Sequence, residues 1–135
     1  MTGAIVSSNG LLIDSDGLIW FMRGHPKAAA ALEKADDWYV SAVSYMELIQ
    51  GCRNKAELRA VQKALKSVDD GVLPVMQGIS DQACTLVEKY SLSHSVHLAD
   101  ALIAATALHH GLPLLTANIK PFLAIEALKI KTFKP

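Results

Sequence analysis

Four polar side chains are of the types that could hold a metal ion, and such an ion could promote cleavage of a phosphodiester bond. Three are acids far apart in the sequence and the fourth is an amide, namely Asp14, Glu47, Asp100 and Asn118. Carboxylate and amide oxygens are hard ligands, which suit Mg²⁺ or Mn²⁺. Such an ion can activate water and screen phosphate oxygens during cleavage. It would also bring positive charge to a chain whose formal net charge is zero, so that a polyanion could be accepted.

Two of these regions also have a purely structural explanation. Asp14 or its neighbour Asp16 could cap the helix that follows, because the first N–H groups of a helix need acceptors. Ser44 and Glu47 fit a capping box, in which the glutamate reaches back to the backbone N–H of the cap residue. The local sequence does not decide between a cap and a metal ligand at either place.

Asp100 is harder to explain by local structure, because the stretch around it, LADALIAATAL, is apolar nearly all round. Burying an unpaired carboxylate costs roughly several kcal/mol or more, which is comparable to the whole free energy of unfolding of a small domain. A neutralising pair with His97, three residues earlier, is one solution. A metal ion shared with Asp14 is the other.

Apolar runs and helical periodicity predict strands that alternate with helices along the chain. We expect strands over residues 11–13, 38–40, 72–76, 114–116 and, at the C-terminal edge, 128–133, and helices over residues 15–23, 27–35, 44–50, 54–68, 79–90 and 97–110. This alternation predicts an α/β fold with a mostly parallel sheet. Ligand sites in such sheets form beyond the carboxyl ends of the strands, where Asp14, the region of Glu47, and Thr116 to Asn118 should lie.

Length and composition indicate one globular domain. The chain has 135 residues, of which 51% are hydrophobic and 19% charged. We expect residues 1–10 to form a flexible extension and residues 11–135 to form a single domain. No stretch is long and apolar enough to suggest a membrane partner, so we expect a cytoplasmic protein. The chain has none of the motifs GxGxxG, GxxxxGK[ST], HExxH or GxSxG, so nucleotide-loop, zinc-protease and serine-hydrolase functions are not supported.

The stretch IDSDGLI resembles the first motif of haloacid-dehalogenase-type phosphatases. That resemblance would make Asp14 a nucleophile and Asp16 a general acid. The family also needs a lysine and an acidic pair after a later strand. The Asp69–Asp70 pair of this chain comes before the weak strand at residues 72–76, so we keep the phosphatase as the alternative function.

A broader resemblance covers nearly the whole chain from Leu11 onward. The stretches LLIDSDGLIWFMRG, VSAVSYMELIQG, HLADALIAATALHHGLPLLT and TANIKPF resemble the PIN-domain ribonucleases, and within them the VapC toxins of bacterial toxin–antitoxin systems. The resemblance implies a PIN-like three-layer α/β/α sandwich with a short, mostly parallel sheet. It also implies Mg²⁺- or Mn²⁺-dependent endonucleolytic cleavage of RNA by a metal-activated water, a homodimer, and inhibition by a cognate antitoxin that inserts a segment near the active site.

Carried over by position, the resemblance makes Asp14, Glu47 and Asp100 the metal ligands and catalytic acids. Asn118 stands where many members have an aspartate, so it could coordinate or orient water only through its carbonyl oxygen. Asp16 is a further departure, which could bind a second ion through water or cap the helix. Trp20, Phe21 and Met22 are candidate antitoxin or dimer contacts, with core packing as the alternative. The loss of charge at position 118 also leaves open a PIN-like binding module without catalysis.

Overall fold

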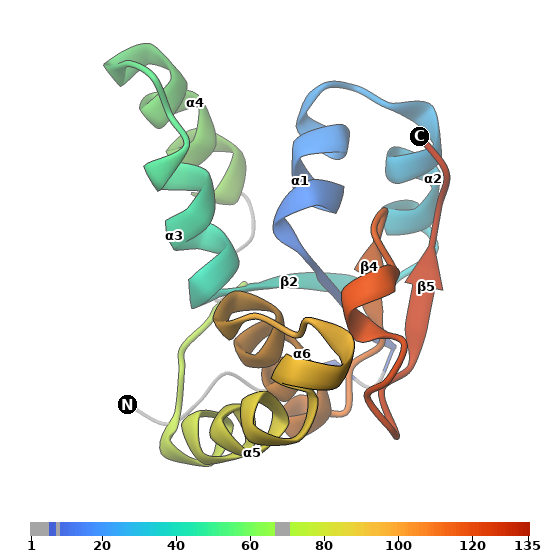
Figure 1. The fold of residues 1–135 in the computed structure, drawn as a ribbon. Coiled ribbons are helices and arrows are strands. Elements are labelled where there is room, and N and C mark those ends of the chain that lie inside the picture. The colour runs from blue at the N-terminus through green and yellow to red at the C-terminus, as the bar shows by residue number, and fades with distance from the viewer. Residues whose placement is uncertain (1–5, 8, 67–70) are drawn as a thin grey trace.

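The computed structural model describes residues 6–7, 9–66 and 71–135, and within them the strands form one parallel sheet. The strand order across the sheet is β3-β2-β1-β4-β5 (Figure 1). The strands are β1 (Gly10–Ile13), β2 (Asp37–Ser41), β3 (Val72–Leu73), β4 (Leu114–Thr116) and β5 (Ile130–Thr132). Because β1 lies at the centre with parallel neighbours on both sides, the carboxyl ends of β1, β2 and β4 meet at the same edge of the sheet.

Helices cover both faces of the sheet. They are α1 (Ser15–Met22), α2 (Pro26–Glu33), α3 (Ala42–Gln50), α4 (Lys55–Lys66), α5 (Gln77–His94) and α6 (Leu98–His110), followed by a short 3₁₀ turn, η1 (Lys120–Phe122). In Figure 1, α5 and α6 lie on one side of the sheet, α1 and α2 lie on the other, and α3 continues into α4 at the margin of the molecule. The predicted three-layer α/β/α sandwich is confirmed.

Alternate residues of the central strand divide the hydrophobic core into two parts. Leu12 points to the face covered by α5 and α6, where it belongs to the same buried cluster as Leu114. Leu11 and Ile13 point to the opposite face, in a second cluster with Leu115 and residues of α1 to α4. Successive side chains of a strand point to opposite faces, so a continuous apolar run is what a strand buried on both sides requires.

The first residue of β1 has no room for a side chain. A Cβ on Gly10 would lie 2.9 Å from Cδ2 of Leu112 and 2.9 Å from Cε2 of Tyr39. Gly10 is therefore packed as the first residue of β1, while the predicted division into an extension over residues 1–10 and a domain over residues 11–135 stays a prediction. The rest of the predicted flexible extension falls mainly on residues 1–5 and 8, which lie outside the described residues.

The predicted elements are confirmed in number and order, with shifted ends. The strand expected over residues 72–76 stops at Leu73, because Pro74 cannot donate to a sheet hydrogen bond. The helix expected over residues 79–90 runs from Gln77 to His94. The end of the helix expected over residues 54–68 falls partly on residues 67–70, which the structure does not describe, and so does the Asp69–Asp70 pair. Among the described residues, no helix combines the length and apolarity needed to span a membrane.

Candidate metal centre

Asp14 lies at the carboxyl end of β1 and is also the N-cap of α1. Its Oδ1 atom accepts a hydrogen bond from Gly17 N at 2.9 Å, so the capping interpretation is correct for this residue. A Cβ on Gly17 would lie 3.1 Å from this same oxygen and 3.0 Å from Cγ1 of Ile13, so the close approach of helix and carboxylate favours glycine here. The carboxylate is thereby fixed at the sheet edge, with only 5% of the residue exposed.

The electrostatic environment of Asp14 disfavours its charged form. Burial raises the pKa of its carboxyl to about 9, and the adjacent carboxylate of Asp16 adds to the rise. Hydrogen bonds from Thr116 and from the backbone of Gly17 lower the pKa but do not offset burial. A pKa shifted this far by burial and a like charge is typical of functional sites, where a bound cation reverses the balance.

Asp16 connects α1 to β4 and does not cap its helix. Its Oδ1 atom accepts two long hydrogen bonds of 3.4 Å, from Oγ1 of Thr116 and from the backbone N–H of Ala117. Thr116 is fully buried at the end of β4, and its Oγ1 atom accepts a hydrogen bond from Asn118 N at 3.0 Å. Asp14, Asp16 and the end of β4 therefore converge at one place, as parallel strand ends allow.

Glu47 lies in the middle of α3, and its predicted capping box is wrong. The N-cap is Ser41, whose Oγ accepts a hydrogen bond from Ser44 N at 3.0 Å, so the helix begins at Ala42. Glu47 is consequently on the second turn of the helix and exposed, and its Oε1 atom accepts a hydrogen bond of 3.1 Å from Oγ of Ser15. Ser15 thus joins the helix after β1 to the helix after β2.

Asp100 occupies the first turn of α6, where its side chain caps the helix. Its Oδ2 atom accepts a hydrogen bond from the backbone N–H of His97 at 3.1 Å. The residue is half-buried, and Leu98 in the same turn is 71% exposed, so the expectation of a deeply buried carboxylate is wrong. The His97–Asp100 contact that we considered exists, but it is a backbone cap and not an ion pair.

The predicted site residues are brought together only in part. Asp14 lies beside Asp16 and Thr116, and Glu47 is joined to the same region through Ser15. Within the described ranges, no three His, Cys, Asp or Glu side chains lie close enough together to hold a metal ion. The full set of Asp14, Glu47 and Asp100 therefore stays a prediction. Ser15 was missed by the sequence reasoning, although its hydroxyl beside Asp14 was the available signal.

The chemistry of the donors nevertheless fits a divalent cation. The side-chain atoms beside Asp14 that could ligate a metal are carboxylate and hydroxyl oxygens. The buried carboxylate of Asp14 lies against that of Asp16, which can carry the same charge. In the part of the chain that the structure describes, the one ion pair joins Arg53 to Glu57, so no basic side chain neutralises Asp14 or Asp16. Two adjacent carboxylates without a basic partner are the arrangement that Mg²⁺ or Mn²⁺ can stabilise.

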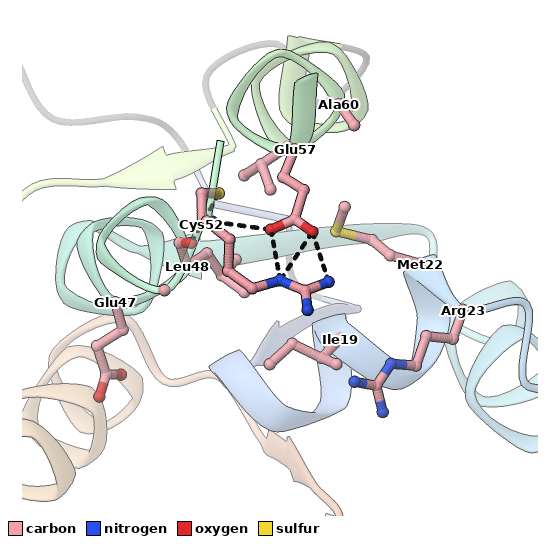
Figure 2. Close-up of a pocket in the computed structure, with 11 residues that line it drawn as sticks. Ile19, Met22, Arg23, Glu47, Leu48, Cys52, Glu57 and Ala60 are labelled. Atoms are coloured by element: carbon pink, nitrogen blue, oxygen red, sulfur yellow. Dashed lines mark hydrogen bonds and ion pairs between the residues drawn. The ribbon is translucent and has the colours of Figure 1, made fainter. Parts of the chain in front are cut away.

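A cleft of about 510 Å³ opens beside this region, between α1 and the α3–α4 arm (Figure 2). Ile19, Met22 and Leu48 supply apolar lining, and Arg53 forms a 2.9 Å ion pair with Glu57 within it. Figure 2 shows the Glu47 carboxylate at one edge of the cleft, pointing away from the Arg53–Glu57 pair.

The three apolar residues after the first acid do not behave as one exposed patch. Phe21 packs edge-on against Trp38 with ring centroids 5.8 Å apart, and Trp20 is similarly placed against His25 at 5.4 Å. Both are partly buried against the core, whereas Met22 is exposed and lines the cleft. Core packing is therefore correct for Trp20 and Phe21, and only Met22 remains a candidate contact.

Comparison with known proteins identifies the family. A model of the PIN domain matches residues 11–127. The chain belongs to the PIN domain family. It is 38% identical over 130 residues to Ribonuclease VapC10 of Mycobacterium tuberculosis, covering 88% of this chain and 90% of that protein. It is 28% identical over 130 residues to Ribonuclease VapC1 of Rickettsia felis, covering 91% of this chain and 96% of that protein.

Solved structures agree with this assignment. The PIN domain superposes on a chain of a toxin–antitoxin complex from Klebsiella pneumoniae with a TM-score of 0.72 and 27% identity, covering 87% of this chain and 94% of that one. A DNA-bound VapBC structure from Salmonella typhimurium superposes with a TM-score of 0.76 at 20% identity, covering 91% and 97%, and so shares the fold. The family prediction is confirmed, and the haloacid-dehalogenase alternative is not favoured.

Proposed function

We propose that this PIN domain is a metal-dependent endoribonuclease, the toxin of a toxin–antitoxin pair. The observation that carries the proposal is the meeting of the Asp14 and Asp16 carboxylates at the end of β1, one of them buried and neither paired with a basic side chain in the described ranges. The similarity to proteins named ribonuclease VapC, which covers 88% and 91% of this chain in the two comparisons, supports RNA as the substrate.

In this proposal Asp14, Glu47 and Asp100 hold the cation, and Asn118 orients water through its carbonyl oxygen. When bound, Mg²⁺ or Mn²⁺ supplies positive charge that makes water a stronger nucleophile and neutralises phosphate oxygens. Gly17 N and the end of β4 keep the two aspartates in place, and Ser15 orients Glu47 through its hydroxyl. Asp100 would exchange its cap on His97 N for the cation, or serve both with its two oxygens.

The phosphatase mechanism has little support in this geometry. The family model that matches residues 11–127 is that of the PIN domain, and without a cation, burial and the Asp16 carboxylate raise the pKa of Asp14. The same environment suits a ligand that ionises when a cation binds, because the cation compensates both effects.

We also propose an antitoxin partner and a homodimer. The structural relative from Klebsiella pneumoniae is itself part of a toxin–antitoxin complex. The cleft between α1 and the α3–α4 arm is a suitable place for an antitoxin segment, because it has apolar walls and opens beside Glu47. Size-exclusion chromatography with light scattering measures the mass of the purified protein, alone and with its antitoxin. These two masses test the homodimer and the complex.

Cleavage of RNA by the purified protein, freed of antitoxin, tests the function. A mixed tRNA and ribosomal RNA pool is incubated with Mn²⁺ or Mg²⁺, alongside lanes with EDTA, Asp14→Asn, Asp100→Asn and a phosphate monoester. The matched control is Asp81→Asn, which removes an exposed carboxylate on α5. We expect discrete fragments that disappear with EDTA and in both site variants but persist in the control. Phosphate release from the monoester with intact RNA would instead favour the phosphatase.

A further inference from the structure

The charge at the edge of the sheet is concentrated on two residues that are adjacent in space and only two apart in sequence. Asp14 and Asp16 approach closely enough for their side chains to share a hydrogen bond, with Asp14 only 5% exposed. No lysine or arginine pairs with either of them in the described ranges. Gly17 N donates to Oδ1 of Asp14, and Oγ1 of Thr116 and the backbone N–H of Ala117 donate to Oδ1 of Asp16, so the two carboxylates are held side by side at the end of β4.

The position that could have supplied a further carboxylate from β4 does not do so. Asn118 is exposed. The hydrogen bond that joins it to Oγ1 of Thr116 is donated by its backbone N–H and not by its side-chain amide. The same hydroxyl donates a hydrogen bond of 3.4 Å to Oδ1 of Asp16, which is 100 residues away in sequence. The Asp16 carboxylate and residue 118 therefore converge on one hydroxyl.

Asp16 is held there by contacts that serve no capping purpose. Asp14 already caps α1, so Asp16 is not needed for the free N–H groups of that helix. Its contacts to Thr116 and Ala117 direct its carboxylate toward the end of β4 and place it beside the buried carboxyl of Asp14. The first turn of α1 favours a negative charge at Asp16, and the contacts with β4 hold that charge beside Asp14, where one cation could bind both carboxylates.

We propose that Asp16 supplies the fourth carboxylate of the metal centre, in place of the charge that Asn118 lacks. The proposal rests on the proposed metal-dependent function and deepens it. In this arrangement β1 and the start of α1 provide two acidic ligands in place of one, and β4 contributes only hydrogen-bond donors that orient Asp16. Asn118 then acts on water or on RNA and contributes little to metal affinity.

Direct metal binding tests the proposal without reference to activity. Mn²⁺ affinity is measured by isothermal titration calorimetry and by electron paramagnetic resonance of free Mn²⁺, for the wild type, Asp16→Asn, Asn118→Ala and the control Asp81→Asn. Asparagine at position 16 keeps an acceptor for Thr116 and Ala117, and thermal unfolding in EDTA verifies that each variant is folded. We expect Asp16→Asn to weaken Mn²⁺ binding by about tenfold or more, and Asn118→Ala and Asp81→Asn to weaken it much less.

Two results would overturn the proposal. One is a folded Asp16→Asn variant that binds Mn²⁺ as the wild type does, and the other is Asn118→Ala weakening the binding as much as Asp16→Asn. Failure of the proposed function gives a different pattern. If Mn²⁺ binding depends on Asp16 but the wild type cleaves no RNA, the ribonuclease function is contradicted and the role of Asp16 stands. If the wild type cleaves RNA but its Mn²⁺ affinity does not depend on Asp16, the role of Asp16 is contradicted and the ribonuclease function stands.

Discussion

Asp14 combines a structural task and a chemical one in a single side chain. One oxygen caps α1 through Gly17 N, and the whole carboxyl is buried next to Asp16. Capping favours a polar acceptor at this position, whereas burial opposes its charge. An amide would satisfy the cap at no electrostatic cost, so under the proposed function the carboxylate serves to bind the cation.

This conflict predicts how stability depends on pH in the absence of metal. With a pKa of about 9 in the folded chain and a usual value of 3.8 for an exposed aspartate, Asp14 keeps its proton when folded and loses it on unfolding at any pH between these values. Its contribution to the free energy of unfolding is therefore full below about pH 4 and is lost as the pH rises toward 9. We expect Asp14→Asn, which keeps the cap, to be more stable than the wild type in EDTA at pH 8.5.

Thermal unfolding in EDTA at pH 4, 7 and 8.5 measures this difference. The advantage of Asp14→Asn should shrink toward pH 4, where the wild-type carboxyl is protonated in both states. Asp81→Asn should follow the wild type at every pH. A wild type as stable as Asp14→Asn at pH 8.5 would contradict the raised pKa.

Asp100 should show the opposite sign, because its carboxylate stabilises the start of α6. It accepts a hydrogen bond from His97 N and lies at the positive end of the helix dipole. We expect Asp100→Asn to lower the free energy of unfolding by about 0.5–1 kcal/mol at pH 7 in EDTA, measured by urea denaturation. A gain in stability would instead indicate that the acids at positions 14 and 100 repel one another in the folded chain.

At the level of the elements, one hydrogen bond joins the helices that follow β1 and β2. Ser15, the first residue of α1, donates to Glu47 in α3. Because Ser41 caps α3, Glu47 lies on the second turn of a helix that starts at the edge of the sheet. The acid is thus placed by the length of β2 and by its cap, and its carboxylate is oriented by Ser15.

Removing this hydroxyl should affect activity more than stability. Under the proposed function, we expect Ser15→Ala to slow RNA cleavage by about fivefold, which corresponds to one hydrogen bond of ~1 kcal/mol. Ser15→Thr should recover most of the loss, and Ser80→Ala, at an exposed serine of α5, is the control. Single-turnover cleavage rates with matched melting temperatures measure the effect, and a rate unchanged in Ser15→Ala would show that Glu47 is oriented by other means.

For the molecule as a whole, the site depends on how firmly the central strand is held. Leu12 is fully buried in β1, pairs in register with Tyr39 and Leu114, and its N–H donates to Pro113 O at 2.9 Å. Both faces of the strand are packed, so a cavity there has little means to collapse.

We expect Leu12→Ala to lower the free energy of unfolding by about 2–5 kcal/mol, as large-to-small changes in a packed core do. The control is Leu123→Ala at a leucine that is 65% exposed, where the change should stay within about 0.5 kcal/mol. Urea unfolding monitored by circular dichroism measures both. A similar loss in the two variants would mean that the stability does not reside in the packing of β1.

Much of the fold follows from local pattern. The short apolar run before Asp14 is typical of a strand buried on both faces, and the alternation of such runs with helical periodicity favours a layered α/β fold. The positions of Asp14 and Thr116 at strand ends follow from the same pattern, because polar residues end a buried strand. Local chemistry also indicated a cap at Asp14 or Asp16, but the choice between the two aspartates came from the structure.

The remaining features depend on contacts between distant segments. Ser41 and Ser44 are both good caps by composition, and the path of the chain out of β2 decides between them. The direction of Asp16 is set by β4, 100 residues later, and the exposure of Asp100 is set by what packs on the first turn of α6. Side-chain direction and burial are properties of neighbours brought together by folding, so no local pattern could specify them.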